Sequence, residues 1–150
     1  MKKMYALYVI GIVMILVICG CGKKETRDFH MENHAWTFAN IVDSTTGTII
    51  ACGENEREKY PEAKVLDMVC EFRDNVMVIR DVNSGNGKEF SYSSIGKDTN
   101  SMIYKLILED GDNALEGMAV SGITEYAKGE YQQTLVIDLD GYALYFVERK

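Results

Sequence analysis

The sequence predicts an all-β domain in which about eight or nine strands form a single antiparallel up-and-down meander that closes into a barrel. Three observations support this fold class. From residue 35 onward, short runs rich in β-branched and aromatic residues recur at a regular spacing. Clusters of Gly, Asn, Asp and Ser separate these runs, and such residues favour turns. No long segment shows the apolar period of an amphipathic helix.

Nine segments have the composition of strands, and the first begins at the single tryptophan, Trp36. A charged segment, residues 54–59, follows the second strand and ends at Tyr60-Pro61. Because proline interrupts a helix, no more than one helical turn is expected there. The strands are expected at residues 36–42, 48–52, 65–72, 76–82, 90–95, 102–108, 115–126, 131–139 and 142–147.

The last two strands form a hairpin whose register follows from its loop. Asp140-Gly141 favours a two-residue turn of type I′. With that loop, Leu135 faces Phe146, and the side of the hairpin that they share is wholly apolar. The opposite side is mixed, which is typical of a strand pair with one face toward the core and the other toward water.

The first 21 residues have a different character. Two lysines precede an uncharged apolar run that ends at Ile18-Cys19-Gly20-Cys21. A basic start, an apolar core and a small residue before the cleavage point are features of a signal peptide. This stretch resembles the lipobox of bacterial lipoproteins, and the resemblance implies a lipid on Cys21. Two alternatives stay open: Cys19 as the lipid acceptor, and an uncleaved membrane helix over residues 4–22.

These features divide the chain into a signal peptide at residues 1–20, a lipidated tether at 21–34 and a β-barrel domain at 35–150. The domain is expected outside the cytoplasm, held at the cell membrane by its lipid anchor. Removing residues 1–20 takes away two lysines and no acids, so the formal charge changes from −7 to −9. Nucleic acid and anionic lipid headgroups are therefore poor partners for the domain, because binding phosphate requires clustered Lys and Arg.

Two cysteines remain in the exported domain, Cys52 and Cys70. A two-residue turn at Asp74-Asn75 pairs Cys70 with Ile79 and so places Cys70 on the inward side. A disulfide between the two cysteines is expected, because exported proteins meet an oxidising environment. It would close a loop of about 19 residues and add roughly 3 kcal/mol of stability. Two separate buried thiols are the alternative.

A one-domain meander with a tryptophan in its first strand is similar to the lipocalin-like small barrels. The resemblance implies an interior just large enough for packed side chains or one small ligand. Aromatic residues spread over several strands would line such a cavity, with core packing as the alternative. The candidate ligand-binding residues are Trp36, Phe38, Tyr92 and Tyr104.

The remaining polar features do not predict an enzyme. His30 and His34 are four residues apart, as metal ligands on one helix face would be, but no further ligand is near them in the sequence. We expect them to be solvated residues of the tether. They are also the only histidines, so a nucleophile paired with a histidine base would have to recruit one of them from outside the barrel. No metal, cofactor or catalytic residue is predicted.

The sequence supports two functional hypotheses. The first is a membrane-anchored lipoprotein that binds an apolar or amphipathic small molecule inside the barrel. The second is an interaction module, such as an inhibitor or an envelope-assembly factor, with a filled barrel and loops that bind another envelope protein.

Overall fold

The computed structural model describes residues 27–110 and 113–150. The predicted signal peptide, the predicted lipidation site Cys21 and the first part of the predicted tether lie outside the described residues. Within the described ranges, no helix has the length and the hydropathy needed to cross a membrane.

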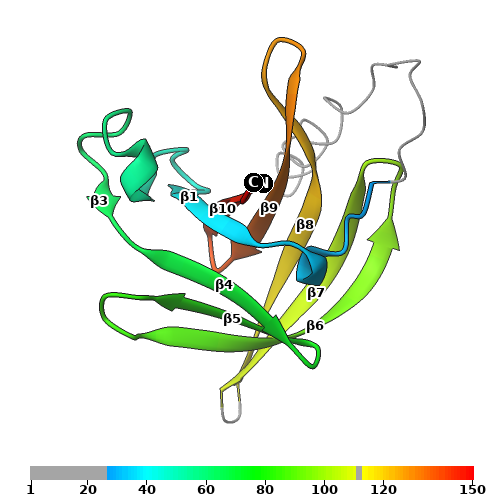
Figure 1. Ribbon diagram of the computed structural model, residues 1–150. Coiled ribbons are helices and arrows are strands. Elements are labelled where there is room, and N and C mark those ends of the chain that lie inside the picture. The colour runs from blue at the N-terminus through cyan, green and yellow to red at the C-terminus, as the bar shows by residue number, and fades with distance from the viewer. Residues whose placement is uncertain (1–26, 111–112) are drawn as a thin grey trace, which may run out of the picture.

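The described residues form one ten-stranded sheet accompanied by short 3-10 helices (Figure 1). This confirms the predicted all-β fold class, and each of the nine predicted segments contains a strand. The third segment is divided in two, as β3 and β4. The helices are η2 (Met31–Asn33) and η3 (Glu54–Glu56), and the strands are β1 (Trp36–Asp43), β2 (Ile49–Cys52), β3 (Lys64–Val65), β4 (Met68–Arg73), β5 (Val76–Asp81), β6 (Gly87–Lys97), β7 (Ser101–Asp110), β8 (Asn113–Ala127), β9 (Glu130–Leu139) and β10 (Tyr142–Glu148).

The sheet combines a long meander with three N-terminal strands. From β4 to β10, each strand pairs with the next one in antiparallel fashion. Strand β1 then pairs with β10, β2 pairs with β1, and β3 pairs with β2 in parallel. The parallel pair departs from the predicted all-antiparallel meander, because the chain crosses over through η3 between β2 and β3 instead of turning back in a hairpin.

The sheet curls into a half-barrel whose two edge strands, β3 and β4, are consecutive in the chain. Two adjacent residues span the opening between these edges. The backbone N–H of Leu66 donates to the carbonyl oxygen of Cys52 on β2, at 2.9 Å. The carbonyl oxygen of Asp67 accepts from the N–H of Val82, beyond the end of β5, at 2.7 Å. The polypeptide itself therefore bridges the gap that strand pairing leaves open.

Both predicted hairpin registers are confirmed. Leu135 is the partner of Phe146 in the β9–β10 pair, and Cys70 is the partner of Ile79 in the β4–β5 pair. Asp140 and Gly141 have φ values of 50° and 81°. Such positive values are those that a type I′ turn requires, which is why this loop sets the register so firmly.

The folded domain begins earlier than predicted. Phe29 and Met31 are buried and belong to the same hydrophobic core as the strands. In Figure 1 the blue segment that carries η2 lies across the barrel beside β7. The prediction of a tether up to residue 34 is therefore wrong for these residues, because the two apolar side chains pack into the barrel interior.

Candidate functional site

The four predicted ligand-binding residues all lie on the inner face of the sheet. Trp36, Phe38 and Tyr104 are buried, whereas Tyr92 is partly buried and packs against the core. The rings of Tyr92 and Tyr104 meet edge to face, with their centroids 5.9 Å apart. Phe38 packs in the same manner on Phe146, at 5.6 Å. These residues thus form part of one continuous aromatic core, and such edge-to-face contacts stabilise it.

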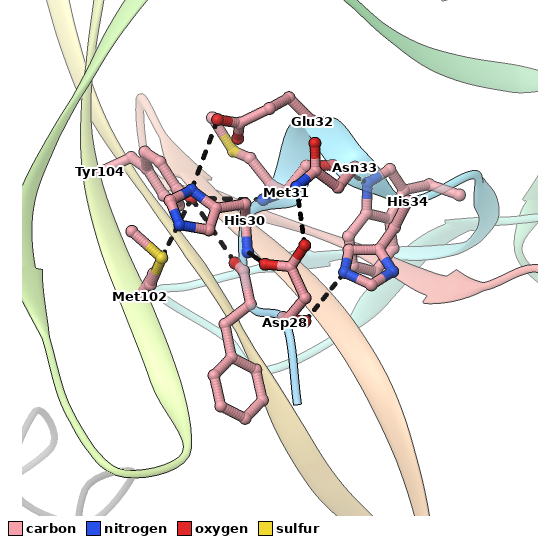
Figure 2. Close-up of polar contacts among 10 residues, drawn as sticks. Asp28, His30, Met31, Glu32, Asn33, His34, Met102 and Tyr104 are labelled. Carbon is pink, nitrogen blue, oxygen red and sulfur yellow. Dashed lines mark hydrogen bonds and ion pairs between the residues drawn. The ribbon is translucent and has the colours of Figure 1, made fainter. Parts of the chain in front are cut away.

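The segment around η2 occupies the mouth of the half-barrel. The side chain of Met31 is fully buried, with 0% of its surface exposed. Its backbone N–H donates to the hydroxyl of Tyr104, at 3.2 Å, as Figure 2 shows. Its carbonyl oxygen accepts from the indole Nε1 of Trp36, at 2.8 Å. Two of the four predicted ligand-binding residues therefore use their polar atoms to hold the protein's own chain.

Burial also favours the protonated form of the Tyr104 phenol. Desolvation raises the pKa of Tyr104 to about 12, against the smaller opposing effect of the Met31 hydrogen bond. The phenol therefore keeps its proton at neutral pH and remains able to donate. Its hydroxyl lies 3.5 Å from the carbonyl oxygen of Phe29 and 3.6 Å from the sulfur of Met102.

Asp28 organises the polar side of the same segment. Its Oδ1 accepts from the backbone N–H of His30 at 2.9 Å, and its Oδ2 accepts from the side-chain amide of Asn33 at 2.6 Å (Figure 2). The Asn33 hydrogen bond, followed by the His30 hydrogen bond, lowers the pKa of Asp28 below its ordinary value. Both bonds are stronger to the ionised carboxylate than to the protonated acid, so the segment folds around a group that favours its negative charge.

His34 fastens the segment to the C-terminal strands. Its Nδ1 lies 2.8 Å from Oε1 of Glu148, and its Nε2 lies 2.9 Å from the carbonyl oxygen of Asp28. Because a carbonyl oxygen only accepts, Nε2 is the donor in the second contact. The same carbonyl accepts from the amide of Gln133 on β9, at 2.9 Å.

The expectation of two solvated histidines is wrong for His34. Only 13% of the His34 side chain is exposed, because the segment packs onto β9 and β10. His30 is more exposed and lies 3.5 Å from Glu32, so the two imidazoles have separate acidic neighbours. No group of three or more His, Cys, Asp or Glu side chains within residues 27–110 and 113–150 is placed to hold a metal ion.

Small residues on β8 do not create space in the interior. A Cβ atom added to Gly117 would lie 2.8 Å from both the carbonyl oxygen of Asp138 and a methyl carbon of Leu139. Ala119 and Ser121, farther along the same face, are fully buried. The glycine is therefore required by close approach of the neighbouring strand, and the space in front of it is filled.

The expected disulfide is not formed, and both cysteines are buried free thiols. Cys70 lies in the hydrophobic core, where burial raises the pKa of its thiol to about 12. Cys52 pairs in register with Asn40, and Asn40 pairs with Tyr145, the residue that precedes inward-facing Phe146. Cys52 therefore lies on the outer face. Residues on opposite faces of a sheet cannot meet the geometry of a disulfide, which is the physical reason for the correction.

An apolar row crosses the outer face of the sheet. Ile103 on β7 pairs in register with Val120 on β8, Val120 pairs with Val136 on β9, and Val136 pairs with Tyr145 on β10. In the sequence, the outward residues of β9 and β10 form only a mixed surface. The row becomes visible once the registers of β7 with β8 and of β8 with β9 are known, and these pairings cannot be obtained from the β9–β10 turn alone.

A groove of about 470 Å³ lies beside this row, on the outer face of β6 to β9. Its apolar lining includes Ile95 and Met118, which are 58% and 44% exposed. A second hollow, of about 440 Å³, lies at the β4–β6 end of the sheet and is lined largely by charged side chains. Neither hollow is lined by the four predicted ligand-binding residues.

By its architecture, the chain is an all-β half-barrel protein whose interior is occupied by its own side chains. Comparison with protein-family models, curated proteins and solved structures found no match to it.

Proposed function

We propose that the chain is a lipid-anchored protein of the cell membrane, facing outside the cytoplasm, whose half-barrel is an interaction module for another envelope protein. The lipobox ending at Cys21 supports the anchor. One observation carries the choice of an interaction module. The interior is filled by Met31 and the aromatic core, whereas large apolar side chains stay exposed on the outer face, as binding surfaces require.

The competing hypothesis, a small molecule inside the barrel, requires the η2 segment to leave. A ligand would have to replace the buried side chains of Phe29 and Met31. It would also have to replace the hydrogen bonds that Met31 makes to Trp36 and Tyr104, because buried donors and acceptors without partners are costly. The interaction module requires no such rearrangement.

The single tryptophan provides the test. A brominated fatty acid quenches tryptophan emission on contact, so binding inside the barrel would quench buried Trp36 saturably. The proposal predicts no quenching beyond that given by the unbrominated fatty acid, measured on the full chain in membranes. Saturable quenching at one ligand per chain would refute the interaction module in favour of the small-molecule hypothesis.

The anchor has a separate test with a matched control. Cys21→Ala is expected to release the protein from membranes, because the substitution removes the sulfur that takes the lipid. Cys19→Ala is expected to leave the protein membrane-bound. The measurement is the distribution of protein between membrane and soluble fractions. Retention of Cys21→Ala would indicate an uncleaved helix or a lipid on Cys19.

A further inference from the structure

The outer face of the sheet carries a surface that combines apolar and acidic side chains. We define the outer surface as Ile95, Ile103, Met118, Val120, Val136 and Tyr145, together with Asp138 and Asp140 of the groove. Ile103, Val120, Val136 and Tyr145 form the cross-strand row, while Ile95 and Met118 line the adjoining groove.

The charges around the groove are unbalanced. Lys105 Nζ lies 2.8 Å from Oε1 of Glu116, so this lysine is already paired with a carboxylate. Asp138 and Asp140 also line the groove, both exposed, and neither forms an ion pair with another described residue. The groove therefore presents two carboxylates beside exposed apolar side chains. A partner that covers it must supply positive charge, because burying an unpaired carboxylate is costly.

We propose that the outer surface binds an extended segment of a partner protein whose surface-facing side chains, at every second position, include both apolar and basic residues, an inference that rests on the interaction function proposed above. In an extended segment, successive side chains point to opposite sides, and every second one reaches the same surface. Apolar side chains of the partner pack on Met118 and Val120, while its Lys or Arg residues pair with Asp138 and Asp140.

Charge and size select this occupant over the others. A second copy of the chain, with 23 acidic and 16 basic residues, would bring like charge to the surface. Phosphate groups of nucleic acid or anionic lipid would be repelled by Asp138 and Asp140. Neighbouring strands are about 4.8 Å apart, so the row from β7 to β10 is roughly 14 Å wide. A small organic amine would cover only part of that width, whereas several residues of a polypeptide would cover all of it.

Fluorescence anisotropy on the full chain in phosphatidylcholine nanodiscs tests the proposal. The probe is a short fluorescein-labelled peptide in which valine and lysine occupy every second position in turn, with serine between them, and empty nanodiscs provide the blank. Saturable binding is expected, weakened by added salt because the pairs with the two aspartates are screened. Met118→Ser should raise the Kd about fivefold or more, and Asp138→Asn about threefold.

Matched substitutions elsewhere provide the controls. Ile50→Ser removes an exposed apolar side chain of β2, and Glu58→Gln neutralises an exposed carboxylate; both should leave the Kd unchanged. Equal effects of the test and control variants would overturn the proposal, since binding would then reflect net charge alone. Equal binding of the same peptide with glutamate in place of lysine, or self-association of the chain through Met118, would also overturn it.

The outcome separates this inference from the function on which it rests. Quenching of Trp36 by the brominated fatty acid would refute the interaction module and the inference together. An unquenched Trp36 with no binding of the lysine–valine peptide would refute only the partner chemistry.

Discussion

Truncation of Met31 measures how much the segment before β1 contributes to the half-barrel. The Met31 side chain is fully buried, and Met31→Ala removes its three outermost heavy atoms. At about 0.8 kcal/mol per buried methylene-sized group, the transfer term is roughly 2.4 kcal/mol, and the remaining cavity adds to it. We expect a loss of about 3 kcal/mol in the free energy of unfolding. With a urea m value of about 2 kcal/mol/M, the midpoint should fall by about 1.5 M.

Met118→Ala is the matched control for this measurement. Its side chain is 44% exposed, so truncation should change the free energy of unfolding by no more than about 0.5 kcal/mol. Both variants keep the backbone groups of the native protein, including those of Met31 that bond Tyr104 and Trp36. A loss below about 1 kcal/mol for Met31→Ala would show that the segment does not plug the barrel in solution.

Three further predictions concern buried and charged groups. Ser121 Oγ is buried without a hydrogen-bond partner among the described residues, so Ser121→Ala should raise the free energy of unfolding by about 1 kcal/mol, measured by urea denaturation. Cys52 and Cys70 should resist iodoacetamide in the folded protein and both react after unfolding without reductant; mass spectrometry that finds a linked pair would contradict the structure. The lowered pKa of Asp28 means that its stabilisation is present above the unfolded pKa and lost as pH falls through the folded one. The wild type should therefore lose stability below about pH 4, and Asp28→Asn should reduce that loss, as urea midpoints at several pH values would show.

The sequence was most informative where local chemistry determines structure. The loop residues Asp140 and Gly141 adopt positive φ, and this two-residue turn sets the register of the β9–β10 hairpin. The pairing of Leu135 with Phe146 was predicted correctly for that reason. The position of Cys52 could not be obtained in this way. No two-residue turn joins β1 to β2, and register shifts occur within both pairings of β1, so alternation along the sequence does not identify the inward face of β2.

The η2 segment was missed for a related reason. Residues 27–34 have no period of two or of 3.6, because a segment that closes the end of a barrel uses only a few side chains, Phe29 and Met31, for burial. Its polar residues bond to its own backbone and to strands far along the chain, such as Glu148 on β10. Contacts of this kind depend on the tertiary fold, and a pattern within eight residues does not contain them.

The apolar row on the outer face has two physical explanations, and one residue separates them. Ile103, Val120 and Val136 are β-branched and pair across neighbouring strands, so their mutual packing stabilises the sheet whether or not a partner exists. Met118 is different, because its partners in register are Lys105 and Asp138. Sheet packing gives no reason for an exposed, flexible apolar side chain between two charged ones, whereas a binding surface gives one, since methionine adapts to varied partners. A substitution at Met118 that lowers binding without lowering stability is therefore the result that distinguishes a docking surface from a well-packed sheet.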